Sequence, residues 1–349
     1  MTVTYAFEHE RRLRAGFIGC GGHSFRNVYP VLRYLPVDLV GVCDLDLDRA
    51  KSYASIFGAE RACSDRDELL AMDLDCVFVV TGVSSYTDIA VDALSAEIAT
   101  WVEKPPVDSL DDVARLRSVI GDTQYAVGLK KAFAPANQKL RELSTAPEFG
   151  TVRSLALRYA QVIPAVHDLE ERTPMREYFL DHLCHPLAAL RLLGGEASTL
   201  YYERAENGSG VAVFTMRSGA VASLHLPWTM SMRGIQERIE VNGDRASAWS
   251  ENNTRVTYAP NPPLRDLHYG RDERHTDDLH SVTVWEPEFS LGQLYNTGAF
   301  VLGYYGELSH FCRAVLDGTP IEIGNLDWAE EGIRIFDAFA EGPGRVIPL

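Results

Sequence analysis

The stretch LRAGFIGCGGHS (residues 13–24) decides the fold. A short apolar run ends in closely spaced glycines, and the following residues, Phe25 to Tyr34, have the apolar spacing of a helix. A glycine-rich turn between a strand and a helix lets backbone N–H groups approach a pyrophosphate at the helix N-terminus. The candidate cofactor-binding residues of this turn are Gly19, Gly21, Gly22, His23 and Ser24.

Asp44 strengthens this interpretation. It ends the next apolar run, VDLVGVCD (37–44), where a carboxylate can accept hydrogen bonds from an adenosine ribose. A carboxylate at this place repels a 2′-phosphate, so the sequence favours NAD over NADP, although Arg26 and Arg49 are nearby cations that could weaken that preference. Ser24 replaces the third glycine of the motif, and the turn alone could also be an ordinary glycine-rich turn.

Up to about residue 128, short apolar runs alternate with amphipathic ones. The expected strands are 13–19, 37–44, 74–82, 98–104 and 124–129, and the expected helices are 25–34, 46–57, 87–96 and 110–120. Apolar strands that alternate with helices indicate a parallel sheet covered on both faces. The N-terminal part is therefore predicted to be α/β, with a doubly wound (Rossmann) parallel sheet.

After about residue 150, strand-like stretches follow one another through tight turns. They are 151–162, 198–205, 210–219, 219–228 and 238–244, and the turn signals are Asn207-Gly208, Ser218-Gly219 and Asn242-Gly243. Polar and apolar residues alternate in them, as in an antiparallel sheet with one buried face. Helices are expected at about 174–193, 298–316 and 327–340, and a long loop at 260–285.

These patterns predict two domains. Residues 12–130 would form the dinucleotide-binding Rossmann domain. Residues 131–349 would form an α+β domain for substrate binding and oligomerisation, with a large, open, mostly antiparallel sheet and C-terminal helices able to pack back on the first domain.

Composition narrows the range of functions. The chain has 349 residues and a net charge of −16 without a basic stripe, which disfavours nucleic acid and anionic membranes as partners. It has no apolar run of about 18 residues, and its N-terminus lacks the apolar segment of a secretory signal. The six cysteines show no metal-ligand spacing, and no third ligand cluster accompanies His182, Cys184 and His185. We therefore expect a cytoplasmic protein without a metal site that acts on a small molecule.

Two further motifs carry chemistry. WVEKPP (101–106) ends the fifth expected strand, so Lys104 would stand at the sheet edge where ligands bind, although a lysine after a strand is most often solvated. LDHLCH (180–185) lies in a helix that begins after Thr173-Pro174, a cap followed by a first-turn proline. Asp181 and His185 are four residues apart and therefore share one face of that helix.

With these motifs, the chain resembles the Gfo/Idh/MocA family of NAD(P)-dependent oxidoreductases, which carries Glu-Lys-Pro and D-x-x-x-H at these places. The resemblance covers nearly the whole chain in element order. It implies that Lys104, Asp181 and His185 are catalytic. The predicted cofactor set is completed at the strand ends by Thr81, Tyr86, Glu103 and Lys104.

The sequence departs from the family pattern at four positions. Leu183 stands where the family usually has glycine, Ala188 where an aspartate often follows, and Tyr86 where a histidine is common. Pro186 lies inside the expected helix and should kink it at a cost of about 3 kcal/mol. The kink would affect the direction in which His185 points, but not the face of the helix on which it lies.

The predicted reaction is the NAD-dependent oxidation of a secondary alcohol on a sugar, polyol or inositol-like substrate, or the reverse reduction. His185 would be the general base, Asp181 would orient the substrate or the imidazole, and Lys104 would donate a hydrogen bond to the developing alkoxide. Candidate substrate residues, which could equally belong to the core or to an interface, are Tyr159, Gln161, His182 and Trp228, and further His167, Arg172 and Tyr178.

Two other functions remain open. The same fold could hold NAD tightly and cleave a glycoside without net redox change, or it could be a non-catalytic NAD-sensing protein, which would not need the Lys–Asp–His trio. The open sheet also predicts a homodimer or homotetramer built face to face through these sheets, because an exposed apolar face usually marks an interface. The family resemblance implies the same assembly.

Overall fold

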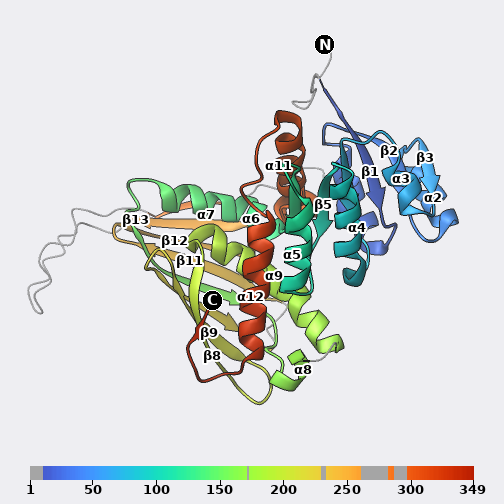
Figure 1. The fold of residues 1–349 in the computed structure, drawn as a ribbon. Helices are drawn as coiled ribbons and strands as arrows, with labels where there is room; N and C mark the ends of the chain where they lie inside the picture. Colours follow the sequence, from blue (N-terminus) through green and yellow to red (C-terminus); the bar gives the residue numbers. More distant parts are fainter. Residues whose placement is uncertain (1–10, 171–172, 229–232, 261–281, 287–296) are drawn as a thin grey trace, which may run out of the picture. The chain divides into compact units, whose positions relative to one another are not determined.

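The computed structural model describes residues 11–170, 173–228, 233–260, 282–286 and 297–349. The chain divides into two compact units (Figure 1). Unit 1 comprises residues up to 133 together with 296–334, and unit 2 comprises 134–295 together with 335–349. The assignment of dinucleotide binding to 12–130 and of substrate binding and oligomerisation to 131–349 stays a prediction.

Unit 1 contains one parallel sheet of six strands. They are β1 (Leu13–Ile18), β2 (Val37–Cys43), β3 (Arg61–Cys63), β4 (Cys76–Val79), β5 (Ala99–Glu103) and β6 (Tyr125–Gly128), in the order β3-β2-β1-β4-β5-β6. The strand order reverses between β1 and β4, and in doubly wound sheets this switch point opens a crevice at the carboxyl ends of the strands. The predicted Rossmann sheet is confirmed.

Helices cover both faces of this sheet because its strands are apolar on both sides. The helices are η1 (Ser24–Val28, a π-helical turn), α1 (Tyr29–Leu32), α2 (Leu47–Phe57), α3 (Arg66–Leu70), α4 (Val83–Ser95), α5 (Leu110–Val119), α6 (Lys130–Phe133), α10 (Thr297–Val301) and α11 (Tyr304–Asp317). One face packs Phe17, Phe78 and Trp101 against Phe311 of α11 in a single core. The opposite face, with Val77 and Val79, is also fully buried.

Unit 2 contains one sheet of nine strands. They are β7 (Val152–Tyr159), β8 (Ala197–Arg204), β9 (Gly210–Met216), β10 (Val221–Leu226), β11 (Glu237–Gly243), β12 (Ala246–Glu251), β13 (Arg255–Pro260), β14 (Thr283–Trp285) and β15 (Ile347–Pro348). Their order is β14-β13-β12-β11-β7-β10-β9-β8-β15, and every pair is antiparallel except β7 with β10. The predicted, mostly antiparallel sheet is confirmed.

The helices of unit 2 pack against one face of its sheet. They are α7 (Pro135–Thr145), α8 (Val166–Glu170) and α9 (Pro174–Gly194), and α12 (Leu326–Ala340) runs from unit 1 into unit 2. Along β9, Ala212 and Phe214 are buried, whereas Val211 and Val213 on the other face are exposed. The sheet therefore has one covered face and one face without a helix layer from the described part of this unit.

Several local expectations differ from the structure. Residues 283–285 were expected in a loop but form β14, and most of the rest of the expected loop lies outside the described residues. Asn242 and Gly243 were expected as a turn but end β11, whereas Gly208 and Gly219 do occupy turns with positive φ. The expected helix at 298–316 is interrupted at Gly303, whose φ is 97°.

The helix α9 runs without interruption from Pro174 to Gly194, through Pro186. Its N-terminus is capped as expected, because the Thr173 hydroxyl accepts a hydrogen bond from the Arg176 N–H. Asp181 and His185 therefore lie on one continuous helix.

Candidate functional site

The glycine turn after β1 is shaped by close backbone packing. Gly19 has φ 106°, and a Cβ added there would lie 1.9 Å from the Val80 carbonyl oxygen, so only glycine fits. At Gly21, by contrast, an added Cβ would meet no atom within 4 Å. The first glycine is thus required by packing against the end of β4, and the second leaves the backbone open to an approaching group. This arrangement fits a pyrophosphate.

Ser24, which replaces the third glycine of the motif, stabilises the turn through hydrogen bonds from its side chain to the backbone. Its side chain is fully buried, and its hydroxyl lies 3.1 Å from the Gly19 carbonyl oxygen and 2.8 Å from that of Gly21, as a donor to both. The helix then begins with the π-helical turn η1, a form that is frequent at functional sites. A direct contact between Ser24 and a cofactor stays a prediction.

Asp44 lies beside this turn. Its Oδ2 accepts a hydrogen bond from the Cys20 N–H at 2.8 Å, and its Oδ1 accepts one from the Asp46 N–H at 3.0 Å. These bonds fix the carboxylate at the end of β2 and leave further lone pairs for ribose hydroxyls. The guanidinium of Arg49 approaches Asp44 Oδ1 at 3.6 Å. The structure therefore brings together the glycines, the carboxylate and the cation that the sequence singled out.

A neighbouring thiol is chemically inert. Burial raises the pKa of the Cys20 thiol to about 12, and a hydrogen bond with Tyr29 opposes that rise only partly. Cys20 therefore stays protonated at neutral pH and is a poor nucleophile. Its contribution to the turn is the backbone N–H that holds Asp44.

The predicted cofactor residues at the other strand ends have different surroundings. His23 Nε2 lies 3.0 Å from Glu103 Oε1, so the glycine turn and the end of β5 are joined by a hydrogen bond. Thr81 lies next to Gly19 and shares a hydrogen bond of 2.8 Å with Ser85 at the start of α4. Tyr86 is buried within α4. Contacts of these residues with a cofactor stay predictions.

Lys104 follows Glu103 directly and is partly buried. Its environment contains charged groups that the sequence did not single out, namely Lys130 and Glu307. Lys130 lies in α6, just after β6, and its ammonium donates a hydrogen bond of 2.7 Å to the Tyr304 hydroxyl. We call Glu103, Lys104, Lys130 and Glu307 the acid–lysine cluster.

Burial dominates the electrostatics of this cluster. Desolvation lowers the pKa of Lys130, and the nearby carboxylates Glu103 and Glu307 oppose that shift. Desolvation raises the pKa of Glu307 well above its ordinary range, Glu103 raises it further, and Lys130 and Lys104 oppose the rise. Both effects disfavour buried charge, and each of Lys130 and Glu307 opposes the shift of the other.

Two features of the sequence could have pointed to Lys130 and Glu307. Lys130, like Lys104, follows a strand of the parallel sheet almost directly. Glu307 lies on the buried face of α11, four residues before Phe311 and three after Tyr304, where an apolar residue would be expected. A carboxylate in an apolar helix stripe is therefore the pattern that could have identified Glu307.

In unit 2, the predicted catalytic residues lie among aromatic rings. The Asp181 carboxylate approaches His182 Nδ1 at 3.3 Å, and the His182 ring stacks on Tyr178 with centroids 4.1 Å apart. His185 is buried, with 8% of its surface exposed, and its ring lies 6.1 Å from that of Tyr159. We call Tyr159, Tyr178, Asp181, His182 and His185 the imidazole cluster.

Tyr159 reaches this cluster from the last residue of β7. Burial raises the pKa of its hydroxyl, and the carboxylates of Glu237 and Asp181 contribute in the same direction. Tyr159 therefore remains a neutral hydrogen-bonding group at physiological pH. A tyrosine hydroxyl, an aspartate and two imidazoles are groups that can bind and deprotonate a hydroxyl-rich substrate.

The remaining substrate candidates are not part of the imidazole cluster. Gln161 is buried, and its amide donates a hydrogen bond of 3.0 Å to the Phe179 carbonyl in α9, which is a structural role. Trp228 is 58% exposed, and its backbone N–H donates to Ser209. His167 is largely exposed beside Asp168, and Arg172 lies outside the described residues.

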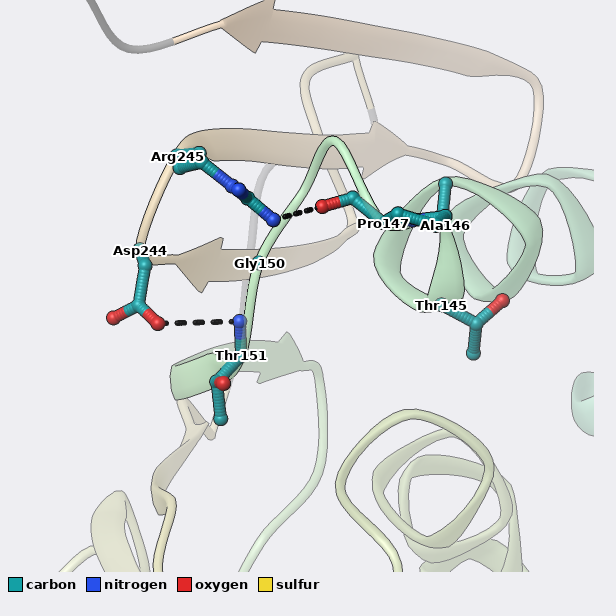
Figure 2. A pocket seen from close by; sticks show the side chains of 7 residues that line it. All are labelled: Thr145, Ala146, Pro147, Gly150, Thr151, Asp244 and Arg245. Atoms are coloured by element: carbon teal, nitrogen blue, oxygen red, sulfur yellow. Dashed lines mark hydrogen bonds between the residues drawn. The ribbon is translucent and has the colours of Figure 1, made fainter. Parts of the chain in front are cut away.

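Two pockets lie away from these clusters. One, of about 430 Å³, is formed in unit 2 between the end of α7 and the turn after β11 (Figure 2). There the Thr151 N–H donates to Asp244 and the Arg245 guanidinium donates to the Pro147 carbonyl. These polar groups of the lining therefore already form hydrogen bonds with one another. The other, of about 730 Å³, lies at the amino edge of the unit 1 sheet, beside Asp75 and Ala99. Neither contains a predicted site residue.

No group of three His, Cys, Asp or Glu side chains in the described part of the chain is arranged to hold a metal ion. Among the described helices, none is both long and apolar enough to cross a membrane.

Family models match both units. Residues 13–128 match the oxidoreductase family with an NAD-binding Rossmann fold, of the Gfo/Idh/MocA type, and residues 137–249 match the Gfo/Idh/MocA C-terminal domain. The two matches together span more than half of the chain and follow the order expected from the motifs.

Individual relatives agree with this result. The chain is 24% identical over 262 residues to the uncharacterized oxidoreductase YrbE of Bacillus subtilis, covering 71% of this chain and 76% of that protein. It is 28% identical over 143 residues to inositol 2-dehydrogenase 3 of Saccharopolyspora erythraea, covering 40% and 42%. An Agrobacterium radiobacter oxidoreductase, solved in complex with NAD+, L-tartaric acid and magnesium, has the same fold, with a TM-score of 0.77, 15% identity and coverage of 97% and 98%.

Proposed function

Because the chain belongs to the Gfo/Idh/MocA family and is an NAD-binding oxidoreductase, we propose that it oxidises a secondary alcohol on a sugar, polyol or inositol-like substrate. The observation that carries the proposal is the carboxyl edge of the parallel sheet. The open backbone at Gly21, the fixed carboxylate of Asp44 and the partly buried Lys104 all lie at that edge. The relative named as an inositol 2-dehydrogenase supports a polyol substrate.

The cofactor would be held by the turn and by Asp44. Backbone N–H groups around Gly21 would bind the pyrophosphate, and the Asp44 carboxylate would accept hydrogen bonds from the ribose. When bound, NAD supplies the acceptor for the hydride. The chain itself binds and orients the reactants and handles the proton.

Three side chains would bind, orient and deprotonate the substrate hydroxyl. His185 would accept its proton, because imidazole titrates nearest to neutral pH. Lys104 would donate a hydrogen bond to the developing alkoxide, which lowers its energy most in a site that excludes water. Asp181, which lies against His182 on α9, would orient the substrate or an imidazole.

A substrate screen tests the proposal. The purified protein would be incubated with NAD+ and with inositols, aldoses, uronates and glycosides, and NADH would be followed by absorbance. We expect NADH formation with one class of polyol or sugar. Product formation from a glycoside without net NADH would instead support the redox-neutral reaction, and binding of NAD without turnover of any class would contradict an enzyme of this kind.

We also propose that the chain assembles into a homodimer or homotetramer through the exposed face of the nine-stranded sheet. On this face Val211 pairs with His225, Val213 with Ser223, and exposed Val221 lies in the adjoining strand. Exposed β-branched residues on neighbouring strands form an apolar surface, and such surfaces usually mark an interface. A second copy, with the same face, is the occupant that such a surface fits.

Light scattering tests the assembly. The wild type is expected at twice or four times the mass of one chain, and Val213→Lys should shift it to the monomer. Ile56→Lys, at an exposed position of α2, is the matched control and should leave the mass unchanged. A monomeric wild type at micromolar concentration would contradict the proposed interface.

A further inference from the structure

Glu307 is a carboxylic acid in an apolar position of α11. Only 2% of its surface is exposed, and within the described residues neither side-chain oxygen has a hydrogen-bond partner. A buried ionised carboxylate without hydrogen bonds is very unfavourable, so the neutral acid is the form that this site accommodates at rest. Ionisable groups in such strongly perturbing surroundings cluster at functional sites.

The surroundings of Glu307 are charged rather than inert. Tyr304 lies one helical turn before it on the same face of α11, and the Tyr304 hydroxyl holds the Lys130 ammonium at 2.7 Å. Lys130 lies in α6, which packs on α11. Glu103 and Lys104, at the end of β5, act on Glu307 electrostatically.

Two more ionisable groups lie on the same two helices: buried Lys131 follows Lys130 in α6 and contributes to lowering its pKa, and His310 lies one turn after Glu307 on α11. The elements β4, β6, α1 and α10 also pack on α11, and they contain Cys76, Tyr125 and Tyr29 but no acidic or basic residue. The outer end of the cluster is the hydrogen bond between Glu103 and His23, whose side chain is 41% exposed. The charged groups that act directly on Glu307 are Glu103, Lys104 and Lys130.

The net charge of the acid–lysine cluster depends on Glu307. With Glu307 neutral, its two lysines formally face one carboxylate, and the cluster is cationic. With Glu307 ionised, the formal charges cancel. The oxidised nicotinamide ring carries a positive charge that the reduced ring lacks. A cationic cluster disfavours the oxidised ring, whereas a balanced cluster accepts it.

We propose that Glu307 releases its proton to solvent when the oxidised cofactor binds and retains it when the reduced cofactor binds, so that a buried carboxylate balances the charge of the ring. The change is Glu307–COOH to Glu307–COO⁻ and one proton in solution, with no covalent step. Glu307 is thus a positioning residue that makes cofactor discrimination depend on pH. The proposal places the nicotinamide beside Lys104, and in this it rests on the proposed function, but it does not depend on the identity of the substrate.

The linkage has a defined direction. Proton release on binding NAD+ means that a rise in pH strengthens NAD+ binding relative to NADH binding. For one proton, the ratio of the dissociation constants, NAD+ over NADH, falls by up to about tenfold per pH unit between the pKa values of Glu307 in the two complexes. Outside that interval the ratio is constant.

Calorimetric titration without substrate tests the proposal. NAD+ and NADH would be titrated into the full-length protein in two buffers of different ionisation enthalpy, which gives the protons released per cofactor, over a series of pH values. The wild type should release up to one proton more with NAD+ than with NADH. Glu307→Gln should show equal proton counts and a ratio independent of pH. Equal counts for both cofactors in the wild type, or a wild-type count in Glu307→Gln, would overturn the proposal.

Two further variants complete the test. Glu97→Gln makes the same chemical change at an exposed position before β5, at the opposite edge of the sheet, and should behave as the wild type. Lys130→Gln removes a cation that favours the ionised carboxylate, so the pH interval should move upward. Loss of the linkage in Lys130→Gln would assign the proton to Lys130 and overturn the proposal, and an unmoved interval would also contradict it, even if Glu307→Gln did not fold.

The outcome is separable from the substrate assignment. A protein that binds both cofactors with the expected proton difference but oxidises no polyol would keep this proposal and lose the proposed reaction. A protein that oxidises a polyol with equal proton counts would do the reverse.

Discussion

The acid–lysine cluster of unit 1 and the imidazole cluster of unit 2 differ in the kind of polar side chain that each contains. Unit 1 buries formal charges, and the Glu307 carboxyl group has no hydrogen-bond partner in the part of the chain that the structure describes. Unit 2 uses aromatic rings that stack, such as His182 on Tyr178. The difference fits the proposed function, in which unit 1 would bind a charged cofactor and unit 2 would exchange a proton with a neutral substrate.

The largest expected effect comes from removing one reacting group on each side of this comparison. His185→Ala and Lys104→Ala should each lower kcat by about 10²–10⁴-fold, because a general base or a donor to the alkoxide acts mainly in the transition state. NAD affinity should change little in His185→Ala. Asp181→Asn should be intermediate, since the amide keeps one hydrogen bond. Turnover and NAD affinity of each variant are measured with the substrate from the screen. Full turnover in His185→Ala would remove the proposed base.

A smaller effect is expected at Asp44, which belongs to unit 1 and should influence only the cofactor. Asp44→Ser should weaken NAD binding by about 1.5–3 kcal/mol through the lost charged hydrogen bonds, while NADP binding improves as repulsion of the 2′-phosphate is removed. Arg49, 3.6 Å from Asp44, is then available to the phosphate. Fluorescence titration with both cofactors checks this. Wild-type protein that binds NADP at least as tightly as NAD would refute the ribose assignment.

Glu307 predicts a pH dependence of stability. Its pKa is raised in the folded protein, so the folded state prefers the neutral acid, and the stabilisation present below the ordinary glutamate pKa of about 4.3 is lost as pH rises towards the folded value. Glu307→Gln has no proton to lose. Its free energy of unfolding should therefore exceed that of the wild type by an amount that grows with pH, with at most a one-proton slope. Urea unfolding at several pH values measures the difference, and a constant difference would contradict a buried acid.

The smallest effect is expected at Gln161, and it tests whether this residue belongs to the substrate site together with the imidazole cluster. Its amide holds the Phe179 carbonyl, and its own Oε1 has no partner among the described residues. Gln161→Met keeps the shape and removes both polar atoms, so the free energy of unfolding should change by less than about 1 kcal/mol and kcat should stay near that of the wild type. Thermal and urea unfolding and turnover provide the check. A loss of kcat comparable to that of His185→Ala would return Gln161 to the substrate site.

The elements predicted from the sequence are those with a strong local signal. Alternating apolar runs identified β1, β2, β4, β5 and β6, and the capping residues at Thr173 and Pro174 marked the start of α9. The strand β3 and the helix α3 were missed because three and five residues are too few to show a period. The strand β14 was missed because it is held by β13 rather than by its own pattern.

The residues of the candidate site likewise fall into those predicted from local sequence and those found only in the tertiary structure. The sequence by itself determined the glycine turn, the carboxylate that follows it and the i, i+4 pair on α9, because each depends on residues close together in the chain. Only the tertiary structure placed Lys130 and Tyr304 in contact across 174 positions and brought Glu307 into the field of Glu103. It also aligned β10 parallel to β7. Such contacts are decided by how separate elements pack to bury apolar surface, and local periodicity carries no information about which distant residue will be the neighbour.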